Sequence, residues 1–163
     1  MHILPITHPE QLVTVRQLAY DTWYIAYEGV ISEQQISYML ANRYALNVLE
    51  QQLISGQDFF LLYEAEQPVG FTAVQYKTDG VSYLHKLYCL PSEHGKGYGK
   101  QLLACAENRA KEQGANLLEL NVNKYNKAVK FYLKMGFEVF REEVLPIGGG
   151  FVMDDFVMRK PLL

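Results

Sequence analysis

Three glycines at alternate positions separate a predicted strand from a predicted helix in the segment His94–Lys100 (HGKGYGK). Glycine lets backbone N–H groups come close to an anion, because no Cβ stands in the way. The amino end of the following helix adds unpartnered N–H donors and a partial positive charge. The segment therefore predicts a phosphate or pyrophosphate cradle, to which Lys96 and Lys100 add charge of the right sign.

Two known phosphate-binding loops fit this segment poorly. A Walker A loop requires Gly-Lys followed by Ser or Thr, whereas Gly99 and Lys100 are followed by Gln101. The dinucleotide fingerprint G-x-G-x-x-G requires a third glycine where Lys100 stands, although Glu119 lies about where a ribose-binding acid would fall. A glycine-rich turn without a ligand is the plain structural alternative.

Hydrophobic spacing predicts the elements that position this loop. Helical spacing is found around residues 12–23, 36–40, 44–53, 100–113 and 126–134. Strands are predicted over 59–63, 69–76, 81–90, 117–123, 137–145 and 151–159. The order is helices, a strand meander, a helix, a strand, a helix and a closing hairpin. This order indicates a mixed α/β layer fold around one sheet, and we expect residues 1–163 to form a single domain.

Composition narrows the class of protein. A chain of 163 residues matches one domain of about 100–200 residues. A net charge of −3 argues against a nucleic-acid partner, which calls for a basic patch. No apolar run approaches the roughly 18 residues of a membrane span, and the N-terminus lacks a signal-peptide pattern, so we expect a cytoplasmic protein. Cys89 and Cys105 form neither a CxxC motif nor a metal-ligand pattern, which predicts reduced, buried thiols and no metal.

Two sequence blocks give the chain a family resemblance. The loop His94–Gly99 resembles the signature Arg/Gln-x-x-Gly-x-Gly/Ala of the GNAT superfamily of acetyl-CoA-dependent N-acetyltransferases, with His94 in place of the Arg or Gln. The segment 126–137 (NKAVKFYLKMGF) is similar to the Asn, Ala, Phe-Tyr and Gly-Phe positions of the family. The resemblance covers about residues 57–160 and implies a mostly antiparallel central sheet flanked by helices. Within the superfamily the chain looks most like the PaiA-type polyamine acetyltransferases.

The resemblance implies how acetyl-CoA would bind as co-substrate. Backbone groups at Leu87 and Cys89 would hold the pantetheine, and the amides of the glycine loop would hold the pyrophosphate. Asn126 resembles the cofactor-contacting Asn of the family, and Lys134 would reach the 3′-phosphate. The residues expected to bind the cofactor are Leu87, Tyr88, Cys89, His94, Gly95, Lys96, Gly97, Tyr98, Gly99, Lys100, Asn126 and Lys134.

Acetyl transfer to an amine also requires an acid and a base. Tyr132 matches the general acid of the family, which protonates the departing thiolate, and an unperturbed tyrosine is protonated at neutral pH. The family's usual strand glutamate is missing, because Tyr83 and His85 occupy its neighbourhood. A two-residue period would place residues 83, 85, 87 and 89 on one face of a strand, which makes His85 the expected base.

An amine acceptor needs anionic or aromatic surroundings. In the family the first helices and the last hairpin line the acceptor site, so Trp23, Tyr27 and Asp154 are the expected substrate-binding residues. Further candidates are Asp21, Tyr24, Glu28 and Asp155. The expected acceptor is a small, polyamine-like primary amine attacked in a ternary complex. A non-catalytic acyl-CoA sensor and a peptide or protein acetyltransferase are the alternatives, and the terminal hairpin is a candidate homodimer interface.

Overall fold

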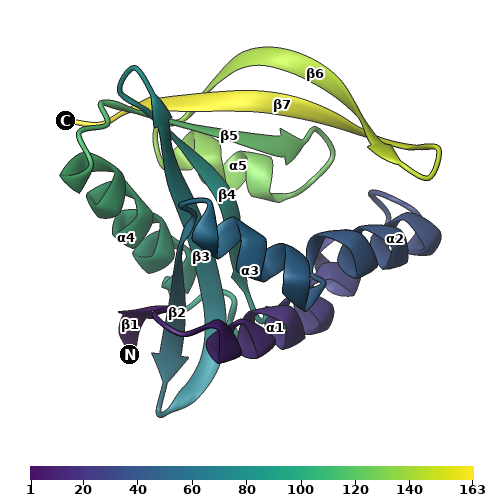
Figure 1. The fold of residues 1–163 in the computed structure, drawn as a ribbon. Coiled ribbons are helices and arrows are strands. Elements are labelled where there is room, and N and C mark those ends of the chain that lie inside the picture. The colour runs from purple at the N-terminus through teal and green to yellow at the C-terminus, as the bar shows by residue number, and fades with distance from the viewer.

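A seven-stranded sheet runs through the middle of the molecule and carries helices on both faces (Figure 1). The computed structural model describes residues 1–163. The strands are β1 (His2–Pro5), β2 (Asp58–Glu64), β3 (Gln67–Thr78), β4 (Val81–Cys89), β5 (Leu117–Asn123), β6 (Glu138–Gly148) and β7 (Phe151–Pro161). The helices are α1 (Leu12–Ala26), α2 (Glu33–Arg43), α3 (Leu46–Ile54), α4 (Tyr98–Glu112) and α5 (Ala128–Lys134).

The strand order is β1-β2-β3-β4-β5-β7-β6, and only the β4–β5 pair is parallel. The mixed, mostly antiparallel sheet flanked by helices is therefore confirmed. The sequence reading missed β1, which pairs with β2 from His2↔Tyr63 to Pro5↔Phe60. The four residues of β1 are largely exposed and show no hydrophobic periodicity. They form a strand only because the edge of β2 is available for pairing.

Two hydrophobic cores hold the helices to the sheet. Helices α1, α2 and α3 cover one face of β2–β4, where Trp23, Leu40 and Phe71 belong to a single buried cluster. Helices α4 and α5 cover the other face, where Leu103 and Leu118 belong to a second cluster. Each fully buried side chain of this size contributes about 1.5–3 kcal/mol. The sheet is thus fixed from both sides around the place where β4 and β5 meet.

Strands β4 and β5 separate after a short parallel contact. Their register covers only Val81–Tyr83 against Leu117–Glu119. Beyond it β4 is paired with β3 alone and β5 with β7 alone. Backbone groups of two neighbouring strands therefore face a gap in the middle of the sheet rather than each other, which leaves them available to a ligand.

A β-bulge in β4 corrects the prediction that residues 83, 85, 87 and 89 share a face. The register passes from Ala73↔Lys86 directly to Val74↔Leu84, so His85 is the extra residue. Alternation is broken there: Leu87 packs with the α4-side clusters and Cys89 belongs to one of them. The side chains of Tyr83, His85, Lys86 and Tyr88 lie instead on the side of helices α1–α3. The bulge thereby turns consecutive polar side chains toward one face.

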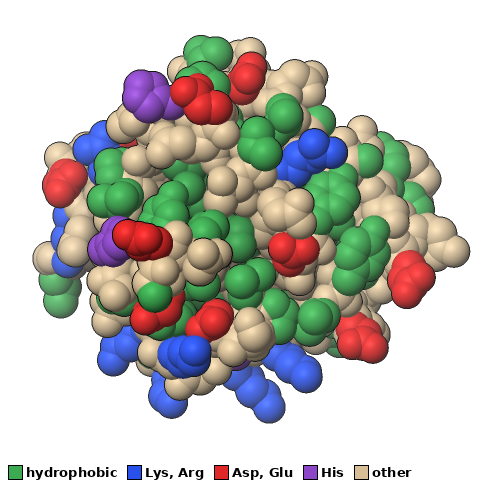
Figure 2. Space-filling model, turned by 90° about the horizontal axis from the view of Figure 1, so that it is seen from below, with side chains coloured by type: hydrophobic (Ala, Val, Ile, Leu, Met, Phe, Trp, Pro, Cys, Tyr) green, Lys and Arg blue, Asp and Glu red, His purple; other side chains and the backbone are tan.

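The surface carries charges of both signs. On the face shown in Figure 2, acidic side chains are interspersed with hydrophobic ones, and basic side chains gather along the lower edge. Exposed charges are screened over about 8–10 Å at physiological ionic strength. Selectivity for a charged ligand therefore depends more on groups inside a cavity. None of the helices has the length and hydropathy needed to cross a membrane.

The sheet is tightly packed around Gly70 of β3, beside the end of β4. A Cβ at Gly70 would lie 2.9 Å from the carbonyl oxygen of Tyr88 and 3.2 Å from Sγ of Cys89. We expect Gly70→Ala to lower the free energy of unfolding by about 1–3 kcal/mol in denaturant titrations, as overpacking does. Gly99→Ala is the matched control, because its Cβ would meet Phe131 at an ordinary 3.5 Å inside α4. Equal stability of the two variants would contradict the expected crowding.

Candidate active site

A cavity of about 430 Å³ opens where β4 and β5 separate. Its walls come from α1, the α2–α3 junction, β4, β5, the start of α5, and the β6–β7 hairpin. Among the residues expected from the sequence, seven line it: Trp23, Tyr27, His85, Leu87, Tyr88, Asn126 and Tyr132. The gap in the sheet thus brings together residues that are more than 100 positions apart in the chain.

The glycine turn forms an anion cradle at the end of β4. Six successive backbone amides, from Gly95 to Lys100, have no hydrogen-bond partner in the protein. Gly95 and Gly97 adopt φ of +86° and +82°, and nothing lies within 4 Å of a Cβ at either position. Since α4 begins at Tyr98, its amino end adds to these donors. The cradle fits a pyrophosphate.

The side chains of the turn mostly serve the turn itself. His94 Nε2 lies 3.1 Å from the carbonyl oxygen of Cys89, which ties the turn to the end of β4. Lys96 pairs with Glu93 at 2.5 Å, and the hydroxyl of Tyr98 donates to the carboxylate of Glu64. These contacts position the backbone, so the unpartnered amides of the turn are the groups that are free to bind an anion.

The expected lysines and the two cysteines differ in their exposure to solvent. Lys100 and Lys134 are exposed, and Lys134 lies in the last turn of α5. The two cysteines are free; Cys89 is buried, and Cys105 is only half-buried, which corrects the expectation for the latter. Burial raises the pKa of the Cys89 thiol to about 12 and that of Cys105 to about 11. Neither thiol is a nucleophile at neutral pH.

Tyr132 occupies the α5 wall of the cavity. Its ring stacks edge-on against Phe131 and Phe137, with centroids 5.3 and 5.5 Å away. The residue is 8% exposed, and its hydroxyl forms no hydrogen bond within the protein. Burial raises the pKa of Tyr132 well above its usual value, so the phenol keeps its proton and is free to donate it.

Asn126 lies two residues before the start of α5, the helix that carries Tyr132. Its Oδ1 accepts a hydrogen bond of 2.9 Å from the amide of Ala128, which fixes the first turn of α5. The residue lines the cavity at the same time. The side chain therefore sets the position of α5 relative to the opening.

His85, the bulged residue, is a neutral imidazole. Gln75 donates through Nε2 to the carbonyl oxygen of Ser55 at 2.9 Å, which turns its Oε1 toward His85. The Nε2–H of His85 therefore donates to that oxygen at 3.0 Å, and Nδ1 is left as an acceptor. Burial first, and then Lys86 and Lys77, lower the pKa of His85 to about 3.

An aromatic wall closes the cavity on the α1 side. Trp23 and Tyr27 stack at 4.7 Å, and Trp23 lies 5.7 Å from the ring of Tyr88. The hydroxyls of Tyr27 and Tyr88 are 3.0 Å apart and share a hydrogen bond. The bulge directs the ring of Tyr88 into this wall. Tyr88, expected to contact the cofactor, thus contributes its side chain to the aromatic wall of the cavity.

The acidic candidates need a correction. Asp154 does not line the cavity, because its carboxylate pairs with Lys124 at 2.8 Å. Asp155, next along β7, points the other way and lines the cavity. Asp21, Tyr24 and Glu28 lie on the exposed face of α1 or beyond its end, outside the cavity.

Several polar residues of the cavity were not predicted from the sequence, among them Arg43, Lys86 and Asn121. Lys86 is 7% exposed, and its Nζ donates to Oε1 of Gln52 at 2.8 Å and of Gln57 at 3.0 Å. Burial, and then Arg43, lower the pKa of Lys86 to about 7. The available signal in the sequence was a lysine within an aromatic strand. The direction in which the Lys86 side chain points, however, depends on the bulge.

These features together meet the requirements of acyl transfer from a CoA thioester: an amide cradle, an opened sheet edge and a protonated tyrosine in the opening. The chain belongs to the GNAT acetyltransferase family, whose acetyltransferase (GNAT) domain model matches residues 27–152. It is 27% identical to the spermidine N(1)-acetyltransferase of Thermoplasma acidophilum, over 89% of this chain and 91% of that protein.

Solved structures agree with this assignment. The PaiA N-acetyltransferase of Thermoplasma acidophilum, in complex with coenzyme A, superposes with a TM-score of 0.82 and 26% identity over 99% of both chains. The ribosomal-protein-S18-alanine N-acetyltransferase of Escherichia coli gives a TM-score of 0.68 at 17% identity, over 99% of this chain and 93% of that chain. The latter similarity shows the shared fold alone.

We expect the buried Lys86 to make the stability of the protein depend on pH. Between about pH 7 and pH 10 the unfolded chain binds a proton at Lys86 that the folded chain does not, so the Lys86 contribution rises with pH. Relative to Lys86→Met, the wild type should gain about 1.4 kcal/mol of unfolding free energy per pH unit from pH 7.5 to 9.5. Urea titrations measure this difference, and Lys111→Met on the exposed end of α4 serves as control. A flat difference would mean that Lys86 stays charged when folded.

Proposed function

We propose that the protein transfers an acetyl group from acetyl-CoA to a primary amine of a small, polyamine-like molecule. The amine would attack the thioester directly, with both substrates bound together. The observation that carries the proposal is the cavity itself, in which Tyr132 faces the opening between β4 and β5 near the amide cradle. The spermidine acetyltransferase among the relatives supports a polyamine-like acceptor.

The cradle and the open strand edge are the proposed binding site for acetyl-CoA, which supplies the activated acetyl group. Amides of Gly95–Lys100 would hold the pyrophosphate, and the exposed Lys100 and Lys134 would add positive charge around the phosphates. Backbone groups of Leu87 and Cys89 border the gap and would align the pantetheine and polarise the acetyl carbonyl.

Tyr132 is the proposed general acid. Protonation of the leaving thiolate requires a donor that is still protonated at neutral pH and placed in the cavity. The raised pKa of Tyr132 meets the first condition, and its unpartnered hydroxyl meets the second. The stacked rings of Phe131 and Phe137 restrict its rotation, so the proton would be presented in a fixed direction.

His85 is the proposed proton acceptor for the attacking amine. The bond to Gln75 fixes the tautomer and leaves the Nδ1 lone pair available. A pKa near 3 keeps the imidazole neutral at working pH, so Nδ1 of His85 would accept a hydrogen bond from the attacking amine and help pass its proton to water. Transfer through a water molecule satisfies the same geometry.

The first test is amine-dependent release of thiol from acetyl-CoA. We expect turnover with spermidine, spermine or a diamine, and a loss of about 10²-fold or more in kcat for Tyr132→Phe with little change in acetyl-CoA affinity. Tyr63→Phe, which removes a tyrosine hydroxyl outside the cavity, should match the wild type. Tight binding of acetyl-CoA without release from any amine would favour a sensor. Full activity of Tyr132→Phe would refute the assigned acid.

A second test addresses His85. Substitution by Gln keeps a donor toward Gln75 and removes the imidazole base, so kcat should fall by about 10-fold or more while acetyl-CoA affinity is retained. With a pKa near 3, protonation of His85 should not produce a limb in kcat/KM between pH 5 and pH 8. An unchanged rate in His85→Gln would indicate a structural imidazole that only supports the bulge.

A further inference from the structure

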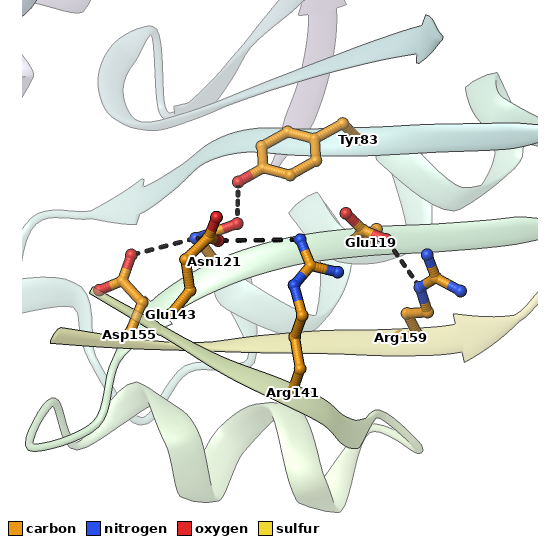
Figure 3. A network of polar contacts seen from close by, with 7 residues as sticks. All are labelled: Tyr83, Glu119, Asn121, Arg141, Glu143, Asp155 and Arg159. Carbon is orange, nitrogen blue, oxygen red and sulfur yellow. Dashed lines mark hydrogen bonds and ion pairs between the residues drawn. The ribbon is translucent and has the colours of Figure 1, made fainter. Parts of the chain in front are cut away.

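Two carboxylates of the β6–β7 hairpin, Glu143 and Asp155, lie close to the amide of Asn121 (Figure 3), and Asp155 lines the cavity. Glu143 of β6 and Asp155 of β7 are directly opposed in the register of the two strands. Like charges in such a pair destabilise a sheet. The arrangement therefore calls for a positive group nearby.

The protein supplies only a neutral group between them. Asn121 Nδ2 lies 3.1 Å from Oε2 of Glu143 and 3.2 Å from Oδ2 of Asp155. The hydroxyl of Tyr83 donates to Asn121 Oδ1 at 2.5 Å, which fixes the amide with its NH₂ toward both acids. Arg141 reaches Glu143 at 3.9 Å and is 48% exposed, so it compensates little. The negative charge is held in place but not neutralised.

One carboxylate oxygen is left without any partner. Asp155 is 5% exposed and lines the cavity, and its Oδ1 is buried with no hydrogen bond. Burial, and then Glu143 and Asp154, raise the pKa of Asp155, whereas Asn121 and Arg43 lower it. Buried polar atoms in native proteins normally have partners. An atom of this kind on a cavity wall indicates a ligand that donates a hydrogen bond.

We propose that Asp155 and Glu143 form a cation subsite that holds a second, non-reacting ammonium group of the acceptor. This inference rests on the proposed acetyl transfer and narrows its acceptor to molecules with at least two amino groups. An ammonium paired with two carboxylates keeps its proton, so it is not the amine that attacks. A metal ion fits less well, because Asn121 turns donor hydrogens rather than an oxygen toward the acids.

The end of α2 and the bulge of β4 carry positive groups, which give the subsite a direction. Arg43 lines the cavity without an ion-pair partner, and Lys86 is bound to Gln52 and Gln57. Both disfavour a cation near the α2–α3 junction. The second ammonium of a diamine is thereby directed to the β6–β7 wall.

The test compares matched amines that differ by one ammonium group. The kcat/KM ratio of putrescine to butylamine, and of 1,3-diaminopropane to propylamine, is measured for the wild type, Asp155→Asn and Glu143→Gln. We expect the wild type to prefer the diamine at least tenfold and Asp155→Asn to reduce this ratio at least tenfold. Asp154→Asn is the control, because that side chain pairs with Lys124 outside the cavity, and its ratio should equal that of the wild type.

Binding of putrescine, measured by calorimetry without acetyl-CoA, separates this proposal from the proposed function. Binding that Asp155→Asn weakens at least tenfold and Asp154→Asn does not would support the subsite, even if no amine were acetylated. A wild type without diamine preference would overturn the subsite while leaving acetyl transfer intact. Asp155→Asn with an unchanged ratio and unchanged putrescine binding would overturn it as well. Thermal melting should show Asp155→Asn folded and no less stable than the wild type, because one of two opposed charges is removed.

Discussion

The separation of β4 and β5 is the constraint on which the rest of the structure depends. Parallel pairing stops after Val81–Tyr83 and Leu117–Glu119, and the two halves of the sheet then diverge. The gap costs backbone hydrogen bonds in the middle of a sheet, where unpaired groups are expensive. Two separate cores, one under α1–α3 and one under α4 and α5, offset that cost and keep the gap open. A ligand that lies along the strand edges would replace the missing partners.

The bulge at His85 decides which chemistry borders this gap. Without it, Lys86 and Tyr88 would have pointed toward α4, and the α1–α3 side of the cavity would have lacked both the buried lysine and the hydrogen bond between the hydroxyls of Tyr27 and Tyr88. With the bulge, the side chains of Tyr83, His85, Lys86 and Tyr88 all lie on the side of helices α1–α3. A single inserted residue therefore separates an apolar side of β4, with Leu87 and Cys89, from a polar side with Lys86 and Tyr88.

Electrostatic conflict concentrates around the cavity. Lys86 is buried with its pKa lowered to about 7, and the opposed carboxylates Glu143 and Asp155 share one amide. Such groups are rare in protein interiors, because a buried charge without a partner is destabilising. Proteins retain unfavourable polar groups chiefly at functional sites, where a ligand completes the interactions. The same reasoning connects the orphaned amides of Gly95–Lys100 to an anion.

Hydrophobic period, glycine spacing and helix starts are local properties, so the order of the helices and of every strand except β1, the mixed sheet and the glycine turn could be predicted from the sequence. It also named Tyr132 through a family motif. Tertiary contacts are needed to explain why β1 forms, why Asp155 rather than Asp154 faces the cavity, and how the bulge regroups Tyr83 to Cys89. Register and bulges arise from pairing between distant strands, and one residue of shift reverses every side chain, so local pattern cannot fix them.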